Sequence, residues 1–342
     1  MDQKPTTIKE IARQLNVSVS TVSRALHNHP SIGLRTRTQV QQLAEALKYE
    51  PNQAAISFKK GKSMTLGLIL PSLGEQYFSM AINGIEDVAT KNGYTVLIGQ
   101  SHDEVKREEQ IVEAMRKQRV DGIIVSLSKS TKSYAHFEQL KSYNIPVVYF
   151  DRVPALPEAF SVSCNLENSS AELIDWLVER GHRHIGFIKG PDTLIHSKQR
   201  LQGYLEGLKR NKLKADNALV VATDLSMGKT RDAMHKLLAL RHTPTAVIAF
   251  NDYVALEAIR YSRQQGLAIN KDICFVSYAN LPITSYLDEP PVASVEQFPY
   301  QQAEKAAEIL FRLIDSKGMD NSIPHQTVLE SKVVVNGRVG ES

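Results

Sequence analysis

Residues 18–24, SVSTVSR, combine hydroxyl, guanidinium and small apolar groups that suit contacts with nucleic acid. An arginine such as Arg24 can donate two hydrogen bonds to one guanine, whereas Val19 can offer only apolar contact, for instance to a thymine methyl group. Hydroxyl groups bond bases or phosphates. This chemistry requires one structural element that presents the side chains together.

Apolar spacing predicts three short helices within the first 50 residues. The first has an apolar face at i, i+3, i+4 and i+7, formed by Ile8, Ile11, Ala12 and Leu15. Asn16–Val17 breaks the pattern, and Ser18 stands where an N-cap residue accepts from the free N–H groups of the next turn. A third helix repeats the spacing at Val40, Leu43, Ala44 and Leu47.

The second helix turns its polar residues outward. Its inner side carries Val22 and Leu26, and its outer side carries Val19, Ser20, Ser23 and Arg24. A helix with small polar residues at an exposed N-terminus suits insertion into a DNA major groove.

A helical bundle without a DNA partner is the alternative, but the charge distribution disfavours it. The first 62 residues hold ten basic and four acidic residues, and the other 280 hold 31 and 33. A basic head on a slightly acidic body favours a polyanionic partner.

From residue 64 onward, apolar runs alternate with amphipathic stretches. The first series is TLGLIL (65–70), YTVLIG (94–99), DGIIVS (121–126) and IPVVYFD (145–151). The second is HIGFIKG (184–190), ALVVA (218–222), TAVIAFND (245–252) and DICFVSY (272–278). Continuous apolar strands separated by helices predict parallel sheets covered on both faces, here in two doubly wound lobes.

Polar residues follow these apolar runs directly, namely Ser72, Ser126, Asp151, Asn251 and Asp252. Open parallel sheets place their ligand crevice at the carboxyl ends of the strands. Asn and Asp also end strands as ordinary turn residues. Because the residues recur at equivalent places in both series, we expect a shared ligand cleft.

No catalytic or metal-binding pattern is recognisable. Gly61-Lys62-Ser63 resembles the end of a phosphate-binding loop, but that loop needs a glycine where residue 56 is Ile. His182-Arg183-His184 has no acid or cysteine at ligand spacing. Cys164 and Cys274 lie inside apolar runs and fit buried, reduced thiols. We therefore expect no enzymatic activity, no metal and no cofactor.

Neither a signal peptide nor a membrane span is visible. The N-terminal segment lacks an apolar core, and no apolar run approaches the roughly 20 residues that cross a bilayer. We therefore expect a cytoplasmic protein without a membrane partner.

The motifs together resemble the LacI/GalR family of bacterial transcription regulators, from about Thr7 to Val335. The first motifs are TIKEIARQLNVSVSTVSRAL (7–26), the Tyr49–Pro51–Asn52 link and TLGLILP (65–71). The second lobe adds GHRHIGFIKGP (181–191), RLQGYLEGL (200–208) and PTAVIAFNDYVALEAI (244–259).

This resemblance implies a homodimer on a pseudo-palindromic operator. Implied DNA contacts in the head are Thr7, Ser18, Val19, Ser20, Thr21, Ser23 and Arg24, with Val19, Ser20 and Arg24 at base-reading positions. A hinge helix over Asn52–Lys59 would enter the minor groove, with contacts from Asn52, Ala55, Phe58 and Lys59. Phe58 stands where the family usually has a leucine wedge; packing onto the first lobe is its alternative role.

The resemblance also implies a small effector between the lobes, often a sugar or nucleobase. Tyr77 and Phe78 match an aromatic pair that some members place against a ring, and Arg200 matches an arginine that meets hydroxyls or a carboxylate. Further expected lining residues are Ser72, Ser126, Asp151, Asn251, Asn280 and Gln297. The segment SYAN (277–280) departs from the usual glycine–aromatic–Asp–Asp pattern, so Ala279 cannot accept from sugar hydroxyls.

We expect an all-α helix-turn-helix head at 1–50, a hinge helix and linker at 51–62, and a two-lobed α/β body of periplasmic-binding-protein type at 63–342. The first lobe would span about 63–161 and 293–323, and the second about 162–292 and 324–342. The expected function is sequence-specific transcriptional regulation, as a repressor, controlled by a sugar or related metabolite. A solute-binding protein would need a signal peptide and no basic head, and an enzyme would need a catalytic constellation.

The expected assembly is a dimer formed along the lobes. The sequence ends shortly after its last expected strand, with SKVVVNGRVGES (331–342), and carries no leucine heptads there. Relatives that form tetramers through a helical tail have such heptads.

Overall fold

The computed structural model describes residues 6–50, 61–316 and 322–336 and divides into two compact units. We call residues 1–63 the head and residues 64–342 the body. The expected contacts Asn52, Ala55, Phe58 and Lys59, and with them the expected hinge helix, lie outside the described residues.

The head contains the three expected helices. They are α1 (Ile8–Gln14), α2 (Val19–Leu26) and α3 (Leu34–Ala46). Ile11, Val22 and Val40 are fully buried, so each helix contributes its apolar face to one core. The predicted cap of α2 is confirmed, because Ser18 Oγ accepts from Thr21 N–H at 3.1 Å.

The first lobe of the body is built on a six-stranded parallel sheet. Its strand order is β11-β5-β4-β3-β1-β2. In chain order the strands are β1 (Thr65–Leu70), β2 (Thr95–Gln100), β3 (Gly122–Val125), β4 (Val147–Phe150), β5 (Ser161–Asn165) and β11 (Gln326–Glu330). One face packs against α5 (Gln76–Lys91) and α12 (Pro299–Ser316). The other packs against α6 (Val105–Lys117), α7 (Ala135–Glu138) and the 3₁₀ turn Gln139–Tyr143.

The second lobe repeats this plan with the strand order β12-β10-β9-β8-β6-β7. Its strands are β6 (Ile185–Lys189), β7 (Val220–Ala222), β8 (Ala246–Ala249), β9 (Cys274–Tyr278), β10 (Ala293–Glu296) and β12 (Lys332–Val335). Helices α8 (Glu167–Glu179) and α9 (Ile195–Arg210) cover one face, and α10 (Met227–Leu238) and α11 (Asp252–Gln264) cover the other. Short 3₁₀ turns lie at Asn217–Leu219 and Pro282–Tyr286.

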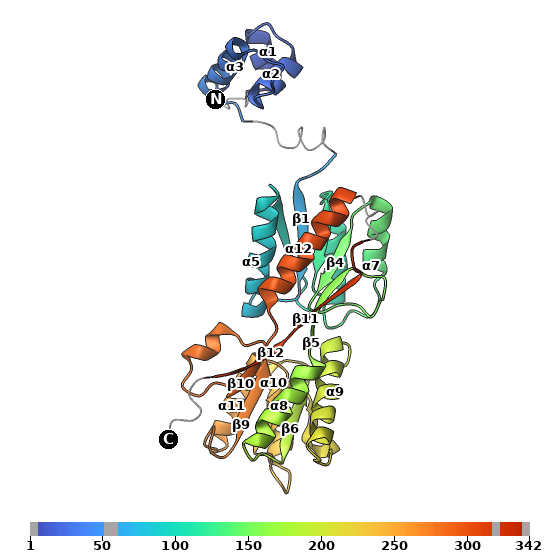
Figure 1. The fold of residues 1–342 in the computed structure, drawn as a ribbon, viewed down its shortest axis with the longest axis vertical. Coiled ribbons are helices and arrows are strands. Elements are labelled where there is room, and N and C mark those ends of the chain that lie inside the picture. Colours follow the sequence, from blue (N-terminus) through green and yellow to red (C-terminus); the bar gives the residue numbers. More distant parts are fainter. Residues whose placement is uncertain (1–5, 51–60, 317–321, 337–342) are drawn as a thin grey trace. The chain divides into compact units, whose positions relative to one another are not determined.

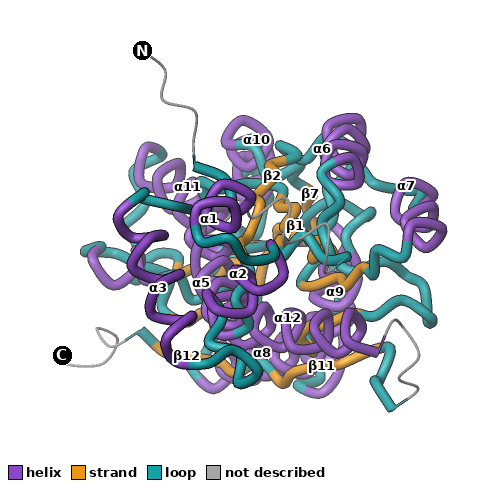
Figure 2. Tube along the Cα trace, turned by 90° about the horizontal axis from the view of Figure 1, so that it is seen from above, coloured by secondary structure: helices purple, strands orange, loops and turns teal. Residues whose placement is uncertain are grey.

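Both lobes therefore have the expected doubly wound architecture, with helices around central strands (Figures 1 and 2). Cys164 and Cys274 are buried and free, as expected. In the second sheet β12 runs antiparallel to β10, and all other pairs are parallel.

The lobe boundaries differ from the expected ranges at three strands. β5 and β11 belong to the first sheet, and β10 belongs to the second. The chain crosses between lobes after β5, after β10 and between β11 and β12. None of these three strands is among the eight apolar runs of the sequence analysis, and apolar spacing does not say which sheet supplies the hydrogen-bonding partner of a strand. The strand pairing of the two sheets defines the crossings.

Close helix packing in the first lobe depends on Gly84. A Cβ atom at this position of α5 would overlap the backbone carbonyl O of Tyr300 in α12. The backbone of α12 cannot move aside as the end of a flexible side chain can, so the added Cβ atom would force α5 and α12 apart.

We predict that Gly84→Ala lowers the free energy of unfolding of the body by about 1–3 kcal/mol, the usual cost of overpacking. Gly228→Ala is the matched control, because this α10 glycine has open space around its Cβ position. There alanine should be neutral or stabilise by up to about 1 kcal/mol. Chemical denaturation of both variants checks the prediction, and equal stabilities would contradict it.

Candidate DNA-binding surface and ligand cavity

The N-terminus of α2 presents the residues expected to contact DNA. Ser18, Val19, Ser20 and Arg24 are exposed, while Thr21 and Ser23 are half-buried. The hydroxyl of Ser18 lies 2.8 Å from those of Ser20 and Thr21, which orders both side chains before any DNA is bound. Val22 and Ala25 anchor the inner face of the helix in the core.

This helix end is also suited to phosphate. The first turn of α2 contains no acidic residue, and its N–H groups are the positive end of the helix dipole. Thr7 is the exposed residue before α1, and its side chain makes no capping hydrogen bond. Its hydroxyl is therefore available for a contact outside the head.

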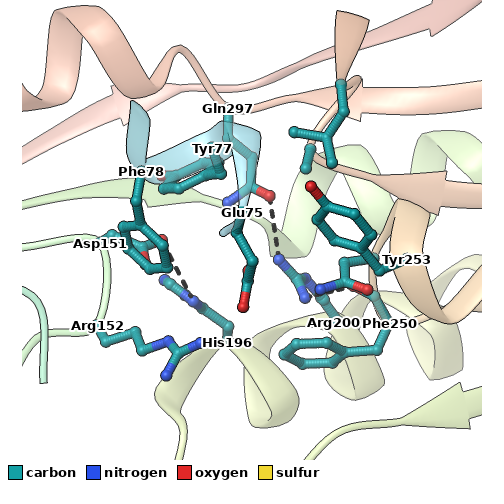
Figure 3. Close-up of a pocket in the computed structure, with 13 residues that line it drawn as sticks. Glu75, Tyr77, Phe78, Asp151, Arg152, His196, Arg200, Phe250, Tyr253 and Gln297 are labelled. Atoms are coloured by element: carbon teal, nitrogen blue, oxygen red, sulfur yellow. Dashed lines mark hydrogen bonds and ion pairs between the residues drawn. The ribbon is translucent and has the colours of Figure 1, made fainter. Parts of the chain in front are cut away.

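A cavity of about 40 Å³ lies in the body where the carboxyl ends of strands from both sheets meet. One buried water needs about 10–15 Å³, so the cavity has room for a few water molecules. Of the nine residues expected in the cleft, six line this cavity, namely Tyr77, Phe78, Asp151, Arg200, Asn251 and Gln297 (Figure 3). The others that line it are Glu75, Arg152, His196, Phe250, Tyr253, Ala279 and Leu281.

The remaining three expected residues do not line the cavity. Ser126 is fully buried behind Asp151, to whose Oδ2 it donates at 3.3 Å. Asn280 turns its amide to the carboxylate of Glu296 at 2.9 Å. Ser72 Oγ accepts from Gly74 N–H at 3.3 Å in the loop before α5. These three side chains have protein partners that the sequence did not reveal.

The side chain of Arg200 lines the cavity, and the residue is 3% exposed. Its Nη1 donates to the Phe250 carbonyl O at 2.6 Å, and its Nη2 donates to Gln297 Oε1 at 3.1 Å. The guanidinium also lies 4.3 Å from the ring centroids of Phe250 and Tyr278. Burial lowers the pKa of Arg200 to about 10, so the group stays protonated at neutral pH.

Asp151 faces His196 across the lobes, with Oδ1 and Nδ1 3.8 Å apart. Burial lowers the pKa of His196 to about 4 in spite of the neighbouring carboxylate. The imidazole is therefore neutral at pH 7 and does not compensate the charge of Asp151. Its Nε2 is buried without a hydrogen-bond partner in the described part of the chain.

Glu75 and Arg152 form the outer part of the cavity wall. Arg152 Nη1 lies 2.5 Å from Asp103 Oδ1, and the guanidinium lies 5.6 Å from the centroid of the Phe78 ring. Burial raises the pKa of Glu75, and the positive charge of Arg152 partly opposes that shift. Figure 3 shows the Glu75 side chain projecting between the two lobes.

Hydrogen bonds join the lobes on both sides of the cavity. Gln76 N–H donates to Tyr253 Oη at 3.1 Å, and Gln76 Oε1 accepts from Ile283 N–H at 3.0 Å. On the other side Lys129 Nζ donates to the Asp224 carbonyl O at 2.9 Å, and Thr193 Oγ1 donates to the Lys129 carbonyl O. The lobes are thus in direct contact at the cavity mouth.

Several lining residues were missed by reasoning from the sequence, although local signals existed. Arg152 and Phe250 each adjoin an expected residue at a strand end. His196 precedes Arg200 by one turn of α9, so both face the same side of the helix. Glu75 is the residue before α5, where the chain enters the cleft.

The head is basic and exposes the N-terminus of α2, and the body has a cavity between the sheets of its two lobes. These features together are typical of a ligand-binding regulatory protein. Two family comparisons agree with this class. Residues 7–52 match the bacterial regulatory proteins of the lacI family, and residues 66–318 match the periplasmic binding protein domain. The chain is 30% identical over 306 residues to the HTH-type transcriptional repressor CytR of Escherichia coli strain K12, covering 89% of this chain and 88% of that protein. This chain belongs to the LacI family of bacterial regulatory proteins and is a DNA-binding transcriptional regulator with a ligand-binding body.

Other relatives are regulators too. Catabolite control protein A of Priestia megaterium is 28% identical over 324 residues, which cover 94% of this chain and 97% of that protein. A solved putative ribose operon repressor from Burkholderia thailandensis is 26% identical, has a TM-score of 0.72 and covers 80% of this chain and 100% of its own. The lac repressor dimer bound to operator and the anti-inducer ONPF shares the fold, with a TM-score of 0.83 and 24% identity over 97% of this chain and 98% of its own.

Within the described residues, no helix combines the length and apolar character needed to cross a membrane. The same residues hold no group of three or more His, Cys, Asp or Glu side chains that could bind a metal ion.

The buried imidazole of His196 predicts a pH dependence of stability. Its pKa is about 4 in the folded protein and 6.5 without burial. Between these values the unfolded chain binds a proton that the folded protein does not, so stability falls as the pH is lowered through this range. The slope should be roughly 1.4 kcal/mol per pH unit.

We predict that His196→Gln removes this part of the acid sensitivity, measured as the unfolding free energy between pH 6.5 and 4. Replacement of the exposed His242 by Gln is the control. Parallel pH profiles for wild type and His196→Gln would show that His196 does not carry the effect.

Proposed function

We propose that this protein is a repressor that binds a pseudo-palindromic operator as a homodimer. Its operator affinity is controlled by a small ring-shaped polar metabolite, a sugar or a related compound, which the cavity would admit by widening between the lobes. The observation that carries the proposal is that one cavity takes aromatic and charged residues from both lobes, while a separate head presents a basic helix-turn-helix.

The head supports sequence-specific binding. The exposed side chains of Val19, Ser20 and Arg24 provide apolar, hydroxyl and guanidinium contacts to base edges. Thr7, Ser18, Thr21 and Ser23 are assigned to phosphates, which fix the position of the helix in the groove. Residues 51–62 are assigned to the hinge between head and body.

The edges of the body support a dimer formed along the lobes. β2 and β7 are edge strands of the two sheets. Leu97 and Ile98 on β2 are 39% and 37% exposed, and Met227, which begins the helix after β7, is 64% exposed. Apolar side chains on an open edge strand are usually covered by a partner, and a second copy of this chain would cover them symmetrically.

We predict that Arg24→Ala costs about 1–3 kcal/mol of binding free energy per half-site and relaxes the preference at one base pair. The duplex would be selected from random sequences with the wild-type protein. Lys59→Ala is the comparison, because loss of a phosphate contact weakens all sequences alike and lowers the salt slope by about one unit per half-site.

Titration of the selected duplex with full-length protein measures both affinity and stoichiometry. Two chains per duplex are expected for a dimer. Equal losses on selected and random DNA for Arg24→Ala would contradict the base-reading role, and one or four chains per duplex would contradict the dimer.

The cavity supports control by a ligand. Asp151 and Tyr77 belong to the first lobe, and Arg200 and Asn251 belong to the second. A ligand that contacts both groups stabilises one angle between the lobes over others. It can shift operator affinity only by its different affinity for the two states of the protein, so the bridging contacts should carry the coupling.

We predict that Arg200→Lys retains operator binding without ligand but reduces the effect of ligand on operator affinity by about tenfold, because a lysine cannot hold the Phe250 carbonyl and Gln297 together at the cavity as the guanidinium does. The ligand would be the compound that raises the melting temperature of the wild-type protein most strongly. Arg210→Ala is the control on the same helix, because Arg210 pairs with Asp175 on the surface. Unchanged coupling in Arg200→Lys would mean that Arg200 has only a structural role.

A further inference from the structure

The carboxylate of Glu108, on α6, is completely buried in the first lobe. Its Oε2 accepts from Ser128 N–H at 2.7 Å, and its Oε1 accepts from the Thr131 hydroxyl at 2.8 Å and lies 3.0 Å from His136 Nε2. A buried carboxylate is costly unless hydrogen bonds replace its water. Burial by itself raises the pKa of Glu108, but these hydrogen bonds outweigh burial and hold the pKa below its ordinary value. The group is therefore ionised at neutral pH.

The donors to Glu108 hold the segment that follows β3. We call residues 127–134 the β3 loop; it contains Ser128 and Thr131, and His136 lies just after it on α7. Ser128 and Thr131 are buried, and Ser128 Oγ also donates to Ser101 Oγ at 2.8 Å. One ionised side chain of α6 therefore fixes the loop at positions 128 and 131.

The β3 loop also carries a contact with the second lobe. Lys129 lies between the two fixed positions; its carbonyl O accepts from the Thr193 hydroxyl, and its Nζ donates to the Asp224 carbonyl O at 2.9 Å. Residues of the loop and Thr193 line a second cavity of about 20 Å³, so the loop and the second lobe face each other there. The place of Lys129 in this contact depends on the conformation that Glu108 gives to the loop.

Asp103 connects the same loop to the wall of the first cavity. Its Oδ1 accepts from Lys129 N–H at 2.9 Å and from Arg152 Nη1 at 2.5 Å, and Arg152 lines that cavity. Asp103 has a φ of 61° and His102 has a φ of 54°. Backbone in this left-handed region persists only where its surroundings hold it. The turn before α6 and the β3 loop therefore support each other.

We propose that Glu108 is a positioning residue for the contact between the lobes, because it holds the β3 loop in the conformation in which Lys129 reaches Thr193 and Asp224. Glu108 lines neither cavity, so it acts only through the loop. Loss of its carboxylate releases the loop, and the lobe angle that this contact favours loses stabilisation. Only the consequence for operator affinity rests on the proposed function.

The first test is hydrogen exchange on the full chain with Glu108→Ala. Without the carboxylate, exchange of the backbone amides in residues 127–134 should become about tenfold faster. Residues 194–197 and 223–226 of the second lobe should exchange about threefold faster, because they lose the contact with Lys129. Glu109→Ala, at the exposed neighbouring position of α6, is the matched control and should change neither lobe.

The conservative variant Glu108→Gln should restore the wild-type exchange pattern. Its amide oxygen can accept from Ser128 N–H, and its amide nitrogen can donate to the Thr131 hydroxyl. Faster exchange of Glu108→Ala in the first lobe alone would overturn the proposal, because Glu108 would then stabilise its own lobe and nothing beyond it.

The second test is a double-mutant cycle across the lobes, measured by chemical denaturation. Thr193→Val removes one hydrogen bond to the loop and should change the unfolding equilibrium constant of the wild type about fivefold. In Glu108→Ala the same substitution should change it less than about twofold, because the contact is already lost. Gln76→Ala, which removes a contact on the other side of the first cavity, is the control and should have the same effect in both backgrounds.

The cycle is repeated with Thr131→Val in place of Glu108→Ala. This substitution keeps the volume of the side chain and removes one of the donors to Glu108, so the test does not depend on how well Glu108→Ala folds. An equal effect of Thr193→Val in every background would overturn the proposal.

Operator affinity separates this inference from the proposed function. With the selected duplex and no ligand, Glu108→Ala and Thr193→Val should shift the affinity in the same direction, because both release the same contact. If the cycle shows the coupling while both variants keep the wild-type affinity, Glu108 positions the loop as proposed and control of the operator through the lobes is wrong. Shifts in opposite directions would overturn the shared role of the two residues.

Discussion

The buried guanidinium of Arg200 is the interaction on which the cavity depends. It ties the end of β8, through the Phe250 carbonyl, to Gln297 in the segment that leaves β10 for α12. Two aromatic rings enclose it, and one of them, Tyr278, is fixed in turn by the hydroxyl of Ser170 at 2.7 Å. A charge buried this deeply is stable only while all these partners remain in place. The positions of β8, β9 and the second crossing are therefore coupled at the site where a ligand would bind.

This coupling matters because one of the three crossings between the lobes, the one after β10, places Gln297 in the cavity wall. A change in the angle between two sheets must be absorbed by short segments such as 297–298, and Phe298 already has a φ of 54°, which is unfavourable for a bulky residue. Small rearrangements around Arg200 can therefore favour one lobe angle over another. Packed elements of this kind have discrete arrangements, and binding energy can shift the population between them.

The sequence predicted the elements better than the contacts. Three helices in the head, the cap at Ser18 and eight of the strands follow from apolar periodicity and residue type. The lobe to which β5, β10 and β11 belong does not, because it depends on hydrogen bonds between segments far apart in the chain. Side-chain partners are equally non-local. Asn280 and Ser126 follow strands, and that place in the sequence suggested that both line the cavity. Their side chains instead donate hydrogen bonds to Glu296 and Asp151.

The turn over 277–280 links the sequence departure to the charge of the cavity. Ala279 has a φ of 101°, a conformation that costs a residue with a Cβ atom. The buried carboxylate of Asp252 holds this turn by accepting from Leu281 N–H at 2.6 Å and from the hydroxyls of Ser277 and Ser294. Asp252 thus ties the backbone of this turn to β9 and β10.

With alanine at position 279, this turn brings no carboxylate to the cavity, whereas Glu75 brings one from the first lobe. The two acidic residues that line the cavity, Glu75 and Asp151, therefore both come from the first lobe. A ligand oriented by its donors would bind this cavity with those donors directed toward the first lobe. The next residue is Gln76, the first of α5, which bonds to Tyr253 and Ile283 of the second lobe, so a residue that lines the cavity and a residue that joins the lobes are adjacent in the chain. A movement of the start of α5 on ligand binding would therefore also disturb a contact between the lobes.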